Sequence, residues 1–297
     1  EGLTVQAVFT STGGLAPDGE MLLAKVGGED QRHGTTSQVG RGLVLSADWV
    51  KDFGTAGIKT DGTLWVWGQN NVGQLGLGNR TAYQSPKQIG ASTNWSNVAP
   101  GGNYCMAVKT DGTLWTWGGN SFGQLGTSDL THRPSPIQLG TNLWTQVSCG
   151  YRHTMAIQTN GTLWAWGYNN YGQLGLNNRT YFSSPRQVGA LTNWSTVSAK
   201  FQSSFSTKTD GTLWAWGYNT LGALGDGTTV SKSSPVQIGS DTNWLSVAAG
   251  GYSAIAVKTN GTLWTWGYNF SGQLGQNDIV ARSSPTQVGS LTNWSNV

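Results

Sequence analysis

The sequence is poor in charged residues, and its acidic residues are few. Asp, Glu, Lys and Arg make up 10% of the 297 residues, with 17 basic and 14 acidic side chains. The three glutamates all precede residue 30. A net charge of +3, scattered along the chain, does not form the concentrated basic patch that nucleic-acid binders usually carry. We therefore expect no nucleic-acid partner.

Cysteine and long apolar stretches are also scarce. Cys105 and Cys149 form neither a C-x-x-C pair nor a disulfide framework, and whether they pair with each other stays open. No segment approaches the ~18 apolar residues that span a bilayer, so we expect no membrane insertion. No D-x-D repeat or His/Cys spacing indicates a metal site, and we expect neither a metal nor a cofactor.

The residues that usually perform catalysis are sparse and dispersed. The three histidines, His33, His132 and His153, lie far apart in the sequence. Paired carboxylates for hydrolysis or a Ser–His–Asp set cannot be assembled from these residues, and no phosphate-binding G-x-x-x-x-G-K-[ST] loop is present. We expect the protein not to be an enzyme.

Tryptophan and glycine are abundant, with 16 and 44 residues, and an internal repeat explains both. The phrase D/N-G-T-L-W-x-W-G begins at Asp61, Asp111, Asn160, Asp210 and Asn260, in steps of 50, 49, 50 and 50 residues. An S-P-x-Q-x-G phrase and a third tryptophan position recur in the same phase. Three sequence features that recur with the same spacing do not arise by chance.

Turn residues divide each unit into four short strands. In the second unit the strands are expected at 95–99, 105–110, 114–117 and 135–140, with a tight hairpin at Asp111-Gly112. A long loop rich in Gly and Asn precedes the last strand. Four antiparallel strands per ~40–50 residues are typical of a propeller blade.

The sequence thus predicts an all-β fold, a single β-propeller over residues 1–297. Regular blades are expected at 49–94, 95–143, 144–193, 194–243 and 244–293. A degenerate sixth blade would combine residues 1–48 with 294–297 and close the ring, which removes open sheet edges. Seven blades, with further sequence outside this chain, are the alternative.

The unit resembles the repeat of the regulator of chromosome condensation family. The resemblance covers about residues 47–297 and rests on W-G-x-N-x-x-G-Q-L-G, as in 117–126 and 166–175, and on the string Gly150-Tyr151-Arg152-His153-Thr154. It implies a propeller of four-stranded blades, usually seven, and a structural place for His153. Bacterial and viral surface proteins are the members that this chain is most similar to.

The family's functions are diverse, so the resemblance does not choose among them. They include nucleotide exchange on a small GTPase with chromatin binding, ultraviolet photoreception and β-lactamase inhibition. Tyr151 stands where photoreceptor members carry a key tryptophan. The chain also lacks the large insertions and the basic tail of exchange factors.

Most of the distinctive residues fit a scaffold role. The tryptophans fall in three columns, and two of these lie on one face of a strand, where they can wedge between blades. A column of lysines, Lys59, Lys109, Lys208 and Lys258, is interpreted as a solvated rim.

Variation is concentrated in the loops that join strands one to two and three to four of each blade. Both sets open on the same face of a propeller, and loops on a rigid frame are the usual place for binding. Tyr and Arg are also enriched at interface hot spots. The candidate binding residues are Tyr104, Phe122, Arg133, Tyr151, Arg152, Tyr168, Tyr171, Arg179, Phe201, Tyr218, Tyr268, Phe270 and Arg282.

These observations favour a non-enzymatic propeller, displayed outside a cell or on a virus particle as an appendage or decoration protein. Its partner would be a protein or a glycan bound by the variable face. The chain would also be able to form part of a larger assembly. An intracellular regulator that binds a small GTPase or chromatin is one alternative. A protein inhibitor of an enzyme is another.

Overall fold

The computed structural model describes residues 54–297 and confirms a β-propeller built from four-stranded blades. Blade 1 contains β1 (Gly54–Ile58), β2 (Leu64–Gly68) and β3 (Tyr83–Gln88). Blade 2 contains β4 (Trp95–Pro100), β5 (Tyr104–Lys109), β6 (Thr113–Gly118) and the first half of β7 (Arg133–Cys149). Blade 3 contains the second half of β7, β8 (His153–Gln158), β9 (Leu163–Gly167) and β10 (Phe182–Gln187).

Two further blades complete the described part. Blade 4 contains β11 (Trp194–Lys200), β12 (Ser203–Lys208), β13 (Leu213–Gly217) and β14 (Lys232–Gln237), with a short 3-10 turn at Thr220–Gly222. Blade 5 contains β15 (Trp244–Ala249), β16 (Ser253–Lys258), β17 (Leu263–Gly267) and β18 (Arg282–Gln287). Within each blade, neighbouring strands pair antiparallel in chain order.

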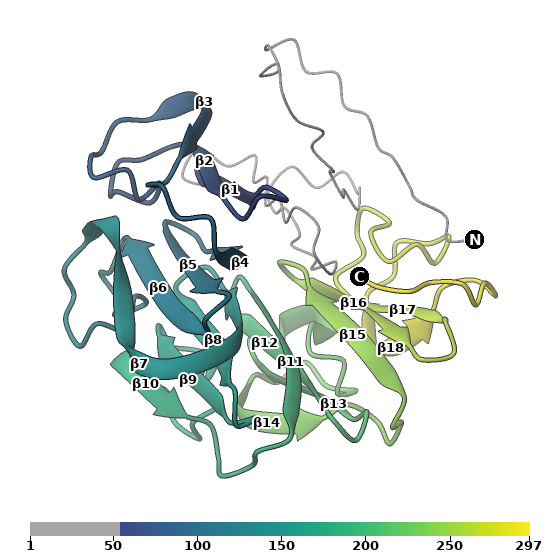
Figure 1. Ribbon diagram of the computed structural model, residues 1–297. Helices are drawn as coiled ribbons and strands as arrows, with labels where there is room; N and C mark the ends of the chain where they lie inside the picture. The colour runs from purple at the N-terminus through teal and green to yellow at the C-terminus, as the bar shows by residue number, and fades with distance from the viewer. Residues whose placement is uncertain (1–53) are drawn as a thin grey trace.

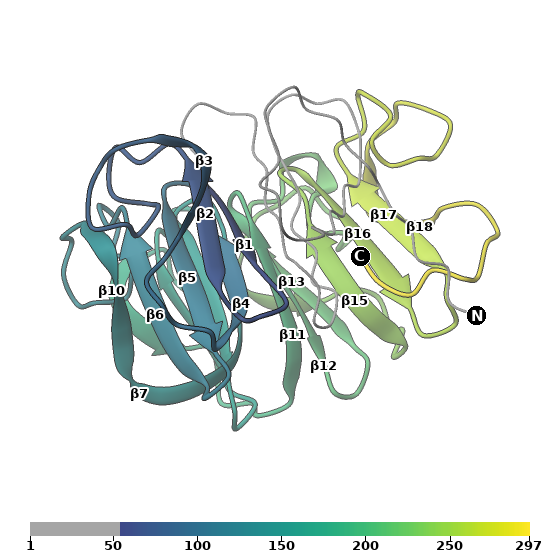
Figure 2. The same cartoon turned by 45° about the horizontal axis from the view of Figure 1, so that its top comes forward.

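The blades follow one another around a common centre in chain order (Figures 1 and 2). The first strands of blades 2 to 5 are the innermost, because β4 contacts β7, β7 contacts β11 and β11 contacts β15. Ala199 N–H donates to Ser148 Oγ, and Ala249 N–H donates to Ser198 Oγ, each at 2.9 Å. These bonds join the inner strands of successive blades.

One connection between blades differs from the others. The sequence predicts separate strands on either side of residue 143, whereas β7 runs through Arg133–Cys149 without a break. The linker between strands four and one has one residue fewer here than in the other units, which is why one repeat step is 49 and not 50. The shorter linker stays extended, so one strand serves two blades.

Tryptophan packing between blades forms the core, as the sequence predicts. Trp117, Trp166, Trp216 and Trp266 are 0% exposed. Each indole N–H reaches the preceding blade; that of Trp216, for example, donates to Gln173 O at 2.9 Å. Four separate core clusters result, one in each gap between the described blades.

The prediction that the lysine column is a solvated rim is wrong for Lys208 and Lys258. Lys208 and Lys258 are each 6% exposed. The Lys208 ammonium lies 4.8 Å from the ring centre of Trp194 and 3.7 Å from that of Trp214. A cation between two indoles is stabilised by their quadrupoles while its methylene stem covers apolar surface. The two indoles come from different strands and lie on either side of the lysine only once the blade has folded.

Residues 1–48 of the predicted closing blade lie outside the described residues, so the closing blade stays a prediction. At the other end of the chain, Trp294 N–H donates to Gly261 O at 3.1 Å. The first tryptophans of the earlier blades make the same bond, such as Trp244 N–H to Gly211 O. This backbone bond is the one that opens the earlier blades, but residues 294–297 form no strand, and the Trp294 side chain is 40% exposed, against 4% for Trp244.

Replacing one tryptophan between blades tests the role of this packing. We expect Trp216→Ala to lower the free energy of unfolding by about 3–5 kcal/mol, because it opens a cavity and removes a buried hydrogen bond. Leu191→Ala, at a side chain that is 48% exposed, is the control and should change it by less than about 0.5 kcal/mol. Urea unfolding followed by circular dichroism measures both, and equal midpoints would contradict the expectation.

Candidate binding face

A buried asparagine shapes each loop between strands three and four. The Asn169 side chain is 0% exposed. Its Oδ1 accepts from Leu174 N–H at 2.9 Å, and its Nδ2 donates to the carbonyls of Asn178 and Thr180, both at 3.0 Å. Asn70, Asn120, Asn219 and Asn269 make equivalent bonds. One repeated residue thus fixes the loop and leaves its remaining side chains free to vary.

Arg133 and Arg282 each form an ion pair with an aspartate of their own loop. Arg282 binds Asp278 at 2.6 Å, and Arg133 pairs in the same way with Asp129. Hydrogen bonds from Val280 N–H and Arg282 lower the pKa of Asp278 and keep it charged. The two arginines were predicted as binding residues because the sequence does not show that an aspartate four residues earlier neutralises each one.

In blades 1 and 3 the same loop forms without this ion pair. Asn178 replaces the aspartate, Phe182 replaces the arginine, and Arg179 is exposed beside them. In blade 1 the corresponding residues are Asn79, Tyr83 and Arg80. Among residues 54–297, neither Arg179 nor Arg80 forms an ion pair. Arg179 therefore remains available on the candidate face.

Tyr104 is buried, so we remove it from the candidate binding residues. It is 1% exposed and packs in the core between blades 2 and 3. Its hydroxyl donates to the carbonyl of His153 and accepts from Thr154 Oγ1 at 3.1 Å. The phenol therefore joins two blades, and a ligand does not reach it.

His153 has the corresponding role one blade further on. Its side chain is 0% exposed, and Nε2 lies 3.0 Å from Ser204 Oγ of blade 4. The ring packs so closely on Gly150 that a Cβ there would lie 2.1 Å from it. Burial lowers the pKa of His153 to about 3, so the imidazole is neutral at physiological pH. The structural place that the family resemblance implies for this residue agrees with these contacts.

Ten aromatic side chains on the variable face form two ring clusters, one of three rings and one of seven, which Arg152 bridges through Phe122 and Tyr151. We call the two clusters together the aromatic arc. Its members come from the one-to-two and three-to-four loops of blades 2 to 5: Phe122, Tyr151, Tyr168, Tyr171, Tyr181, Phe201, Tyr218, Tyr252, Tyr268 and Phe270.

Rings of neighbouring blades meet in a repeating way. Phe122 of blade 2 lies 5.2 Å from Tyr168 of blade 3, and Tyr171 of blade 3 lies 5.0 Å from Tyr218 of blade 4. The residue before each G-Q or G-A pair therefore meets the tyrosine after W-G in the next blade. Edge-to-face geometry at these separations is favourable.

The one-to-two loops form the inner part of the arc. Tyr151 N–H donates to Phe201 O at 2.9 Å, and Gly102 N–H donates to Tyr151 O at 3.2 Å. Phe201 has a φ of +47°, a left-handed conformation that is unusual for an aromatic residue. Backbone contacts between successive loops thus fix rings close to the centre of the face.

The arc includes two residues that the sequence interpretation missed. Tyr181 lies 4.8 Å from Tyr168, and its hydroxyl donates to Asn170 Oδ1 at 2.7 Å. Tyr252 lies 4.8 Å from Phe201. Both vary at their repeat positions, where blade 4 carries Ser231 and Gln202. That variation was the available signal.

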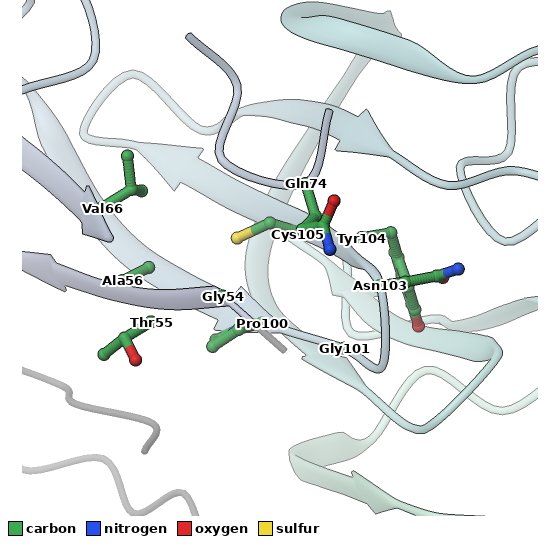
Figure 3. Close-up of a pocket in the computed structure, with 10 residues that line it drawn as sticks. All are labelled: Gly54, Thr55, Ala56, Val66, Gln74, Pro100, Gly101, Asn103, Tyr104 and Cys105. Carbon is green, nitrogen blue, oxygen red and sulfur yellow. The ribbon is translucent and has the colours of Figure 1, made fainter. Parts of the chain in front are cut away.

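A small hollow at the junction of blades 1 and 2 offers no catalytic set (Figure 3). Its lining includes Val66, Gln74, Asn103, Tyr104 and Cys105 but no His, Asp, Glu or Lys. Burial raises the pKa of the Cys105 thiol well above its usual range, so the thiol is not an activated nucleophile.

Neither metal ligation nor membrane spanning is indicated within residues 54–297. No group of three or more His, Cys, Asp or Glu side chains there could hold a metal ion. No helix in this part is long and apolar enough to cross a bilayer.

The buried histidine gives a pH-dependent stability that can be measured. Between about pH 6.5 and pH 3 the unfolded chain protonates this residue and the folded protein does not, so the free energy of unfolding falls as the pH is lowered. We expect His153→Ser, which installs the residue that blades 4 and 5 carry at Ser203 and Ser253, to weaken this dependence. Urea midpoints at pH 7.5 and 5.0 measure it, and an unchanged difference between the two midpoints would count against a neutral buried imidazole.

Solved structures of similar fold include yeast RCC1 (Prp20), crystallised with Kap60, at 19% identity and a TM-score of 0.71. The match covers 80% of this chain and 60% of that one. Prp20p from Saccharomyces cerevisiae, described with its binding to Gsp1p and histones, matches at 20% identity, TM-score 0.71, with 84% and 64% covered. Human WBSCR16 matches at 20% identity, TM-score 0.70, with 80% and 65% covered.

These likenesses establish the fold, and the chain spans less than two thirds of each of these proteins. No curated protein matches the sequence. The RCC1-like domain family matches residues 45–297, which is most of the chain. The repeated tryptophan packing, the four-stranded blades and this match together show that the chain belongs to the RCC1-like domain family.

Proposed function

We propose that this propeller is a non-enzymatic binding module that recognises a protein partner through the face carrying the aromatic arc. The observation that carries the proposal is the arc itself, two clusters of partly exposed rings bridged by Arg152 on a scaffold whose remaining residues repeat. Rigid loops rich in Tyr are typical of protein recognition surfaces.

Exposed aliphatic side chains on the same loops support this proposal. Leu130, Val230, Ile279 and Val280 lie in three-to-four loops and are 57–64% exposed. Phe270 at the end of the arc is 58% exposed. Apolar side chains gathered at the edge of an aromatic surface favour a protein partner over a glycan, because sugars present mostly hydroxyl groups.

The chemistry of the described residues supports a role without catalysis. The hollow between blades 1 and 2 lacks acid and base side chains. His153 is neutral and enclosed between blades. The acidic side chains of the variable face form ion pairs within their own loops.

Surface display is the second part of the proposal. The low charge and the Asn-, Thr-, Ser- and Gly-rich loops support a protein displayed outside a cell or on a virus particle, as an appendage or decoration. Mass spectrometry of purified particles and of isolated cell surfaces tests this. Detection in the cytosol alone would end this part of the proposal and leave the binding face untouched.

Regulation of a small GTPase is a second candidate, favoured by the fold shared with Prp20p, which is described as binding Gsp1p and histones. A nucleotide-release assay with purified GTPases distinguishes the two proposals. Faster nucleotide release would favour regulation of a GTPase over surface display. We expect the protein not to accelerate release.

Selection of peptides against the folded protein tests the binding face. We expect peptides from a random display library to bind the wild type and to lose at least tenfold in affinity when Tyr218→Ser and Phe270→Ser are combined, since aromatic anchors dominate such contacts. The control combines Leu191→Ser and Leu291→Ser, exposed residues of the opposite face. Peptides that respond to the control pair and not to the arc pair would place binding on the other face.

A further inference from the structure

Among residues 54–297, Arg152 is the one cation set against rings of the aromatic arc. It lies in the loop between β7 and β8, next to Tyr151. Its guanidinium carbon lies 4.4 Å from the ring centre of Phe122 and 4.8 Å from that of Tyr151. Stacking against both rings holds the planar group in one orientation, so little freedom is lost when it binds.

Within residues 54–297, Arg152 has no carboxylate partner and its guanidinium forms no hydrogen bond. The aspartates of the variable face, Asp129, Asp226 and Asp278, are paired with Arg133, Lys232 and Arg282. The other described aspartates, Asp61, Asp111, Asp210 and Asp241, lie in the turns of the opposite face. Its five guanidinium N–H donors thus have no acceptor among the described residues and lie beside apolar rings.

The electrostatic character of this face follows from that pairing. Arg152 and the exposed Arg179 are cations that no described aspartate neutralises, so this face of blades 2 and 3 is positive. The same face of a second copy carries the same charges, which disfavours two such faces meeting. A partner that complements this face is acidic.

A carboxylate suits Arg152 better than a phosphate does. One guanidinium matches one carboxylate in charge and can bind both of its oxygens with parallel hydrogen bonds. Phosphate groups are usually held by clusters of arginines, and the ring-lined site around Arg152 contains one. The surrounding rings of Phe122, Tyr168 and Tyr181 favour apolar groups next to the carboxylate.

We propose that Arg152, framed by Phe122, Tyr151, Tyr168 and Tyr181, anchors an acidic segment of the partner protein, with an Asp or Glu placed next to an apolar or aromatic side chain. This inference rests on the proposed function, that the variable face binds protein. It adds that the partner is acidic at this contact and that Arg152 selects it.

The test uses a random peptide library displayed against the intact chain, followed by affinity measurements on the enriched peptides. We expect enrichment of Asp or Glu beside an apolar residue. Arg152→Gln should weaken these peptides about tenfold or more, because it removes a charge pair among desolvated rings. Blade 4 carries Gln202 at the same repeat position, so the variant has a precedent for folding.

Arg179→Gln is the matched control, since Arg179 is an exposed arginine of the same face without stacked rings, and it should change affinity less than threefold. A double-mutant cycle with the peptide's acid changed to Gln or Asn should show that the loss at Arg152 disappears when the acid is absent. The melting temperature of each variant shows whether the loop remains folded.

Three outcomes would overturn the inference. Enriched peptides without an acid, or acidic peptides that bind Arg152→Gln as tightly as the wild type, would leave the face as a binding site and remove Arg152 as its anchor. Binding of duplex DNA that is lost in Arg152→Gln would show that Arg152 binds a phosphate and not a carboxylate. Peptides that respond to the Leu191→Ser and Leu291→Ser pair, and neither to Arg152→Gln nor to the Tyr218→Ser and Phe270→Ser pair, would instead contradict the proposed function.

Discussion

The contact on which the described structure depends is the tryptophan that each blade places against the one before it. The indole of Trp166 is fully buried, and its N–H donates to Gln124 O of blade 2. A large side chain that is also hydrogen-bonded fills the gap between two sheets and fixes their relative position. Because the same contact recurs at Trp117, Trp216 and Trp266, the spacing of the blades is set by repetition.

This regular frame allows the loops to differ. The buried asparagine of each three-to-four loop bonds backbone groups, so it places no demand on neighbouring side chains. An ion pair such as Asp278–Arg282 and an asparagine with an aromatic residue, as at Asn178 and Phe182, are alternative ways to complete the same loop. The frame therefore keeps its geometry while the chemistry of one face changes.

The aromatic arc gives that face its character. Its rings pack against each other across blade boundaries, which holds them in place before any partner arrives. Preorganised rings lose little entropy on binding, and binding energy then comes from a few anchors. Arg152, stacked between Phe122 and Tyr151, is the one cation of residues 54–297 fixed within this surface. The face thus combines apolar area with one directional charge.

The sequence by itself determined the repeat, the four strands of each blade and the scaffold role of the tryptophans. Those features depend on local turns such as Asp111-Gly112 and on alternation along a strand, which neighbouring residues decide. It also indicated the variable face and most members of the arc. Only the tertiary structure decided that Tyr104 is buried, that Lys208 lies between two indoles and that Arg133 and Arg282 are neutralised. For Tyr104 the decisive neighbours belong to another blade about 50 residues along the chain. For Lys208 and the two arginines they are brought close by strand pairing and loop folding, and one sequence does not show which side chains such folding brings together.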